Sequence, residues 1–250
     1  MKNTSYSSLV AKFYDSFLED NIDDIEYLKQ YYKDKGGSIL ELACGTGRIL
    51  IPLLKSGIKI DGLDNSEDML VVASKKLKMN SLQCNLYNQD MVNINIDSTY
   101  DNVLIACGSF MILNNENALK CLSSIKKILN EQGEILIDLF IPWDDIKQDK
   151  STSFSIARDV VIGKERCIVY ESFEHSIKEQ TKYGTYKYEY YNDQELVKTE
   201  INSLNIRWYY EKEIEELLSS AGFNEIKILQ NSPDYSKNEC FIITAKKKNI

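Results

Sequence analysis

A glycine turn behind an apolar strand gives this chain a segment suited to binding a flat ligand. Residues 38–43 read as a buried strand with the acidic Glu41 near its end, and Gly45 and Gly47 then flank Thr46. Glycine carries no Cβ and adopts positive φ freely, so a ligand can lie directly against this backbone. The unpaired N–H groups at the start of the next helix face the same spot. The segment is therefore a candidate shelf for a cofactor.

A second acidic residue, Asp64, stands at the end of the next predicted strand, residues 58–63. In nucleotide-binding α/β folds an acid about 20 positions after the glycine turn holds the ribose diol. Both hydroxyls can donate to one carboxylate. The alternative is that Asp64 only caps the following helix. Ser66 already serves that end as a cap, which leaves Asp64 for the ligand.

Two cofactor classes compete for such a turn. A dinucleotide site has the fingerprint G-x-G-x-x-G, but the position of its third glycine is Leu50 in this chain. The complete string from Glu41 through Cys-Gly-Thr-Gly-Arg48 instead resembles motif I of the class I S-adenosylmethionine (SAM)-dependent methyltransferases. The string from Gly62 to Leu70 resembles motif II of the same family. SAM is therefore favoured over a dinucleotide.

The resemblance implies roles for residues after each strand. Asp64 binds the ribose, Asn65 and Met69 line the adenine pocket, and Asp90 and the Met91 N–H meet the adenine edge. Taken alone, an Asp in a polar loop such as Asp90 is usually only a turn residue. The implied cofactor-binding residues are Tyr14, Glu41, Ala43, Cys44, Gly45, Gly47, Asp64, Asn65, Met69, Asp90, Met91 and Cys107.

The N-terminal segment also carries a resemblance. Residues 5–35 read as two helices broken near Asn21, and Ala11-Lys-Phe-Tyr-Asp15 is similar to the Tyr-Asp helix that lies across the SAM pocket in small-molecule methyltransferases. On that resemblance Tyr14 is a candidate catalytic residue that reaches the sulfonium or the acceptor. Packing of this helix over the sheet is the alternative.

Candidate acceptor-side residues are more scattered. Ser109 follows the fourth strand, where the family places the acceptor. His175, the single histidine, is a candidate general base if the inserted sheet that carries it folds over the pocket. Tyr186 and Tyr188 could enclose a cationic or planar acceptor. Arg207 is a candidate clamp for an acidic group. For each there is a plainer alternative: a surface histidine, tyrosines packed against the parallel domain or a second subunit, and an ion pair within the sheet.

The order of elements predicts an α/β fold. Apolar strands at 38–43, 58–63, 81–87, 101–106 and 134–140 alternate with amphipathic helices, a pattern typical of a doubly wound, Rossmann-like parallel sheet. Gly133 is predicted to close a helix, and Pro52 either to delay the start of the helix after the glycine turn or to bend that helix. Strands at 225–230 and 239–245 complete a seven-stranded, mostly parallel sheet.

Residues 152–207 change from helical spacing to alternation, which predicts an inserted antiparallel sheet of strands near 154–162, 166–177, 181–191 and 196–206. The predicted domains are therefore 1–151 with 208–250, which bind SAM, and 152–207. The inserted sheet is expected to act as a lid or as a dimer surface, so a homodimer through it is one expectation.

Composition narrows the function further. The chain has 250 residues, a formal net charge of −8 and 43% hydrophobic residues. Nucleic-acid binders usually carry a basic face, so the charge disfavours an RNA or DNA substrate. The six cysteines and the lone histidine show no metal-ligand spacing, which predicts no metal. The absence of an apolar span or signal-like start predicts a cytoplasmic protein with no membrane partner.

These observations predict a SAM-dependent methyltransferase. It would pass the methyl group to an N or O atom of a small-molecule acceptor by in-line displacement and leave S-adenosylhomocysteine (SAH). The alternatives are an RNA methyltransferase and a non-catalytic SAM- or SAH-binding interaction module.

Overall fold

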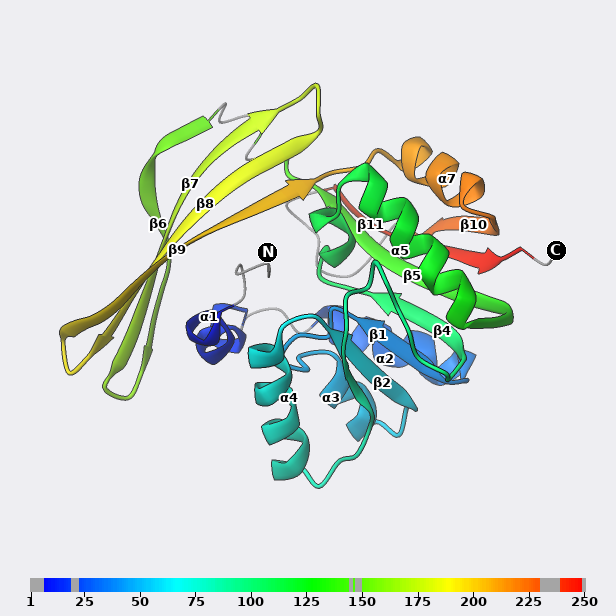
Figure 1. The fold of residues 1–250 in the computed structure, drawn as a ribbon, viewed down its shortest axis with the longest axis horizontal. Coiled ribbons are helices and arrows are strands. Elements are labelled where there is room, and N and C mark those ends of the chain that lie inside the picture. Colours follow the sequence, from blue (N-terminus) through cyan, green and yellow to red (C-terminus); the bar gives the residue numbers. More distant parts are fainter. Residues whose placement is uncertain (1–6, 19–22, 144–145, 147–149, 230–238, 249–250) are drawn as a thin grey trace.

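The computed structural model describes residues 7–18, 23–143, 146, 150–229 and 239–248. Two sheets organise them, a larger one of seven strands and a smaller one of four (Figure 1). The described part of the chain has no helix that combines the length and the apolar character needed to cross a membrane.

The larger sheet is mostly parallel. Its order is β10-β11-β5-β4-β1-β2-β3. Neighbours from β5 to β3 pair in parallel, whereas β11 is antiparallel to both β5 and β10. Its strands are β1 (Ile39–Leu42), β2 (Ile60–Asp64), β3 (Leu86–Asn88), β4 (Tyr100–Ile105), β5 (Leu129–Ile141), β10 (Phe223–Leu229) and β11 (Glu239–Lys247). All four residues of β1 are buried, as expected for a central parallel strand that is covered on both faces.

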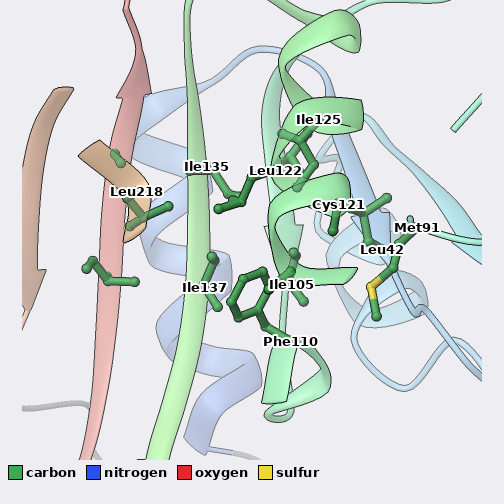
Figure 2. Packing of buried hydrophobic residues seen from close by; sticks show 14 of the residues in the cluster. Leu42, Met91, Ile105, Phe110, Cys121, Leu122, Ile125, Ile135, Ile137 and Leu218 are labelled. Atoms are coloured by element: carbon green, nitrogen blue, oxygen red, sulfur yellow. The ribbon is translucent and has the colours of Figure 1, made fainter. Parts of the chain in front are cut away.

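Helices cover both faces of this sheet. On one face α5 (Asn115–Ile128) and α7 (Glu211–Ser220) pack in the larger core, and Figure 2 shows Leu122 and Ile125 of α5 against Ile135 and Ile137 of β5. On the other face α2 (Asp23–Lys35) and α3 (Leu50–Lys55) form a second core. The helix α4 (Glu67–Met79) follows β2 and contributes to that second core.

The smaller sheet is an antiparallel meander. Its strands β6 (Lys150–Ile162), β7 (Glu165–Ser176), β8 (Thr181–Asn192) and β9 (Glu195–Arg207) pair in chain order. Its inner face, which lies toward the N-terminal helix, carries alternate residues of the two central strands. These are Cys167, Val169, Glu171, Phe173 and His175 in β7 and Lys182, Gly184, Tyr186, Tyr188 and Tyr190 in β8.

The first helix, α1 (Ser8–Phe13), lies between the two sheets (Figure 1). On one side Leu9 and Phe13 pack against Cys167 of β7. On the other side Val10 packs against Met69 of α4. The smaller sheet therefore reaches the larger domain through this helix, and the short 3-10 helix η1 (Asp15–Phe17) continues it.

The predicted fold class is confirmed: a mostly parallel seven-stranded sheet, N-terminal helices and an inserted antiparallel sheet. The division into 1–151 with 208–250 and 152–207 stays a prediction, as does a dimer through the inserted sheet. The predicted break near Asn21 lies outside the described residues.

Two local predictions were wrong. Gly133 does not close a helix: α5 ends at Ile128, and Gly133 lies within β5, in the register irregularity between the pairs Tyr100–Leu129 and Asn102–Glu134. A Cβ on Gly133 would lie 3.0 Å from the Asn130 carbonyl oxygen, which explains glycine at this bend. The third strand is shorter than predicted, Leu86–Asn88 instead of 81–87.

The predicted late start of the helix after the glycine turn is confirmed. The helix α3 begins at Leu50, and Pro52 falls in its first turn. A proline there removes no intrahelical hydrogen bond, because the first N–H groups of a helix have no carbonyl partner within it.

Candidate active site

A pocket opens at the carboxyl ends of the parallel strands, the edge where α/β sheets bind ligands. It has an empty volume of about 510 Å³, including space open to solvent. Its lining comes from the ends of α1, β1, β2, β3 and β4 and from the start of α4. The lining residues are Tyr14, Ala43, Gly45, Leu63, Asp64, Asn65, Met69, Gln89, Met91, Ser109 and Ile112.

Asp64 ties the glycine turn to the end of β2. Its Oδ2 accepts the Gly45 N–H at 2.8 Å and its Oδ1 accepts the Ser66 N–H at 2.8 Å. Ser66 does cap α4 through the Met69 N–H, as expected, but Asp64 is not left uncommitted. A carboxylate has about four lone-pair sites, so beside its backbone donors Asp64 can still accept a hydrogen bond from a ligand hydroxyl.

Burial raises the pKa of Asp64, while the hydrogen bonds from the Ser66, Gly45 and Asn65 backbone oppose that shift. The carboxylate is 8% exposed. A ligand that donates to it would offset part of the cost of burying this charge.

The two glycines of the turn have different structural roles. Gly45 has φ 55°, and a Cβ placed on it would meet nothing within 4 Å, so its backbone faces open pocket. Gly47 has φ 80°, and a Cβ there would lie 3.0 Å from Cδ1 of Ile51. Gly45 therefore lets a ligand approach, whereas Gly47 lets α3 pack closely.

Two ion pairs hold the N-terminal segment on this turn. Asp15 pairs with Lys76 and accepts from the Thr46 hydroxyl at 2.6 Å, and Lys76 donates to the Thr46 carbonyl at 3.0 Å. Asp24 of α2 pairs with Arg48 through both carboxylate oxygens. Together they place Tyr14, at the end of α1, against the pocket.

The turn after β4 is fixed from the neighbouring strand. Asp138 of β5 accepts the Cys107 N–H at 2.7 Å and the Gly108 N–H at 2.6 Å. Cys107 and Gly108 have φ of 56° and 64°. This turn starts the 3-10 helix η2 (Ser109–Ile112), and so Asp138 determines where Ser109 lies in the pocket wall.

Glu41 lies beneath the turn, within β1, and is 4% exposed. Burial raises its pKa to about 8; the Arg48 guanidinium acts in the opposite direction, and Asp64 adds to the rise. Among the described residues its Oε2 has no hydrogen-bond partner. A ligand donor, or an ordered water that bridges to one, would satisfy this buried atom.

The raised pKa of Glu41 gives a test by protein stability. Between pH 4.5 and about 8 the folded chain keeps a proton that the unfolded chain has lost. The free energy of unfolding should therefore fall as pH rises through this window, by at most roughly 1.4 kcal/mol per pH unit. Urea unfolding at several pH values should show that Glu41→Gln flattens this slope. Glu131→Gln, at an exposed position, is the control. Equal slopes in all three proteins would contradict the assignment.

Eight of the residues predicted to bind cofactor or acceptor line the pocket: Tyr14, Ala43, Gly45, Asp64, Asn65, Met69, Met91 and Ser109. Leu63, Gln89 and Ile112 line it too and were missed. For two of them the signal was adjacency, since Leu63 precedes Asp64 and Gln89 precedes Asp90. The roles of these residues stay predictions.

Five predicted cofactor residues are not in the lining. Glu41 lies below the turn, Gly47 contacts Ile51, and Cys44 faces β2, since a Cβ on Gly62 would lie 2.7 Å from its Sγ. Cys107 is exposed, with its Sγ 2.8 Å from Nη2 of Arg48. Asp90 forms a turn, and its Oδ1 accepts the Val92 N–H at 2.9 Å.

Four predicted acceptor-side residues also lie outside the lining. Tyr186 and Tyr188 pack on α1, which agrees with the plainer alternative of packing against the parallel domain. Arg207 pairs with Glu213 and lies 4.2 Å from the centre of the Tyr209 ring. The His175 ring is 5.1 Å from that of Phe173 and 6.3 Å from that of Trp208. Their roles also remain predictions.

Within the described ranges, no three or more His, Cys, Asp or Glu side chains gather in a way that could hold a metal ion.

Comparison with known proteins agrees with this geometry. Residues 39–133 match a family described as a methyltransferase domain. A protein of Geobacillus sp. (strain WCH70), assigned as a methyltransferase, is 34% identical over 125 residues, which are 49% of this chain and 51% of the relative. The chain spans about half the length of the curated relatives it matches.

Two solved structures share nearly the whole fold. A SAM-dependent methyltransferase from Clostridium acetobutylicum ATCC 824 superposes with a TM-score of 0.76 at 18% identity, covering 96% of this chain and 98% of the other. The sugar N-methyltransferase KedS8 from Streptoalloteichus sp. ATCC 53650 superposes with a TM-score of 0.73 at 17% identity, covering 94% of this chain and 93% of the other. The predicted fold class is confirmed, and the match over residues 39–133 supports the predicted methyltransferase domain in that part of the chain.

Proposed function

We propose that this chain, which contains a domain of the SAM-dependent methyltransferase type, transfers the methyl group of SAM to an N or O atom of a small-molecule acceptor. The observation that carries the proposal is the pocket at the ends of β1 and β2, where the open backbone of Gly45 and the buried carboxylate of Asp64 meet. The match over residues 39–133 supports the reaction class.

The residues of the pocket fit SAM. Asp64 can accept a hydrogen bond from the ribose, Met69 and Met91 offer apolar surface to the adenine, and Gly45 leaves space for the chain that carries the sulfur. The buried, unpartnered Oε2 of Glu41 is a further polar atom suited to the polar end of this ligand. When bound, SAM supplies an electrophilic methyl group on a cationic sulfur.

The protein contributes binding, orientation and exclusion of water. Tyr14 and Ser109 line the pocket from different elements, so an acceptor that contacts both can be aligned for attack in line with the departing sulfur. The ion pairs of Asp15 and Asp24 keep the N-terminal segment in place as one wall of the site. A hydroxyl acceptor would need a base to take its proton, whereas an amine needs only to be neutral.

A small-molecule acceptor is supported by the position of the inserted sheet. The inner face of β7 and β8 packs on α1, and the pocket is lined by Tyr14 at the end of that helix, so the inserted sheet stands beside the site. The fold shared with a sugar N-methyltransferase is consistent with an acceptor of this size.

The test has two steps. Isothermal titration calorimetry should show binding of SAM and of SAH, and [methyl-³H]SAM incubated with a small-metabolite extract should give a labelled product. Tight SAH binding without any labelled product would favour the non-catalytic module. The absence of binding at saturating concentration would reject the proposed function itself.

A further inference from the structure

A buried polar cluster lies on the inner face of the smaller sheet, outside the pocket lining described above. Lys182, 8% exposed, places its Nζ 2.7 Å from Oε1 of Glu171. The Tyr186 hydroxyl donates to the same oxygen at 2.9 Å. The Lys182 ammonium also lies 4.5 Å from the centre of the Phe173 ring. The cluster therefore consists of a charge pair with a third hydrogen-bond donor and an aromatic wall.

Stability does not explain this cluster. Removing two charges from water costs several kcal/mol per ion, and their attraction repays that cost only when the geometry is excellent. Well-packed apolar residues of similar size often serve a fold equally well. The rest of this face does use apolar contacts, since Cys167 and Val169 pack on Leu9 and Phe13 of α1. The pair is therefore better explained by binding.

The sheet register places the cluster next to the pocket. Glu171 is directly opposite Tyr186, and one step along the same face, roughly 7 Å away, Tyr188 joins the apolar cluster that contains Tyr14 and Met69. Both of those residues line the pocket. One end of the cluster thus adjoins the α1 wall of the site.

The other end of the cluster connects to η2, which also lines the pocket. The Phe173 ring contacts that of His175, which neighbours Trp208. The next residue, Tyr209, packs 5.7 Å from the ring of Phe110, which belongs to η2. Because η2 supplies Ser109 and Ile112 to the pocket, a series of ring contacts connects the cluster to this part of the wall as well.

Glu171 retains an unused acceptor. Lys182 and Tyr186 both bind Oε1, whereas no donor from the described residues reaches Oε2. The side chain is 19% exposed, so a small ligand can reach it. A carboxylate oxygen accepts up to two hydrogen bonds, which makes Oε2 a preformed binding point.

We infer that Glu171, held by Lys182 and Tyr186, binds the acceptor of the reaction by accepting a hydrogen bond from its amine. This inference rests on the proposed function and narrows it to an amine acceptor. An N–H of the amine points to Oε2, and its nitrogen lone pair is then left to face the methyl group.

The ion pair explains why the amine is held in its reactive form. An unpaired carboxylate favours the charged form of a neighbouring amine, and an ammonium has no lone pair with which to attack. Lys182 cancels the charge of Glu171, so the carboxylate accepts a hydrogen bond from a neutral amine without strongly favouring its protonation. On attack the nitrogen–carbon bond forms, the carbon–sulfur bond breaks with its electron pair on sulfur, and the extra proton leaves the nitrogen to water.

Binding of matched probes to the SAH-saturated protein tests this inference. Ligand-observed NMR would measure dissociation constants for pairs that differ in one group: glucosamine and glucose, ethanolamine and ethylene glycol, glycine and glycolate. We expect at least one amine to bind more tightly than its hydroxyl partner. Glu171→Ala should lower the affinity for that amine tenfold or more. Glu171→Gln should lower it less, because the amide oxygen still accepts a hydrogen bond.

Two controls separate binding from folding. Glu174→Gln alters an exposed acid on the other face of the same strand and should change nothing. The double variant Glu171→Ala with Lys182→Met removes both charges of the pair together with the acceptor, so it should fold and lose the amine preference. All variants should bind SAH as the parent does.

The other possible outcomes separate the inference from the proposed function. Amine binding that survives Glu171→Ala, hydroxyl probes that bind better than their amines, or no amine binding alongside normal SAH binding would overturn the inference and leave the proposed function standing. Failure of the parent protein to bind SAH would reject the proposed function instead.

Discussion

Gly45→Val is expected to lower the affinity for SAM and SAH at least a hundredfold while the protein stays folded. The Cβ direction of Gly45 points into open pocket space, where a valine side chain would occupy the ligand's place. Valine is also strained at φ 55°, by roughly 1–3 kcal/mol, which would disturb the N–H that Asp64 accepts. Titration calorimetry would measure the affinity, and circular dichroism would follow the fold.

A matched control separates occupancy from strain. Gly57 also has positive φ, 81°, and a Cβ there meets nothing within 4 Å, but it lies in the turn after α3 and does not line the pocket. Gly57→Val should thus carry a similar backbone cost and keep its affinity for SAH. Equal losses in both variants would mean that strain, and not contact with the ligand, explains the effect.

Asp64→Ala should lower the affinity for SAM and SAH tenfold or more, a loss of at least about 1.4 kcal/mol of binding free energy. The variant removes the acceptor for the ribose and, at the same time, the links to the Gly45 and Ser66 N–H groups. Asp64→Asn should also bind weakly, because its amide nitrogen would face a backbone donor.

The pH dependence of binding follows from the same residue. Burial raises the pKa of Asp64 above its ordinary value of 3.8. Protonation of Asp64 removes acceptor capacity. The affinity for SAH should therefore fall as pH is lowered through the raised pKa of Asp64, and it should reach its maximum above that pKa.

Asp61→Asn is the control for this second prediction. Asp61 lies on the same strand, but it accepts from Asn85 and from the Tyr100 hydroxyl and does not line the pocket. Its variant should retain SAH affinity. If Asp64→Ala bound SAH as well as Asp61→Asn does, the carboxylate at 64 would have no role in holding the ligand.

The sequence predicts the fold well where the periodicity is unambiguous. Apolar strands followed by amphipathic helices located β1, β2, β4 and β5 within a few residues. The third strand was overextended because residues 81–85 contain apolar side chains, yet Asn85 is held by Asp61 and pairing begins only at Leu86. Gly133 resembled a helix stop, although the chain had already entered β5.

The site was predictable where it is local in sequence. The glycine turn and Asp64 lie 19 residues apart and follow adjacent strands, so their spacing alone places them together. The Tyr14–Asp15 pair indicated Tyr14, but the partners of Asp15, Thr46 and Lys76, come from other elements. Asp138 was missed for the same reason, since its partners lie 30 and 31 residues earlier.

The placement of α1 has a consequence for how the chain is made. Lys12 of this helix pairs with Glu165, 153 residues later. At a synthesis rate of about 5–20 residues per second, the ribosome needs roughly 8–30 s to produce the strand on which α1 rests. During that interval the newly emerged helix keeps Leu9 and Phe13 without their final cover. Nascent chains should therefore be most exposed to chaperones and proteases before the second sheet is translated.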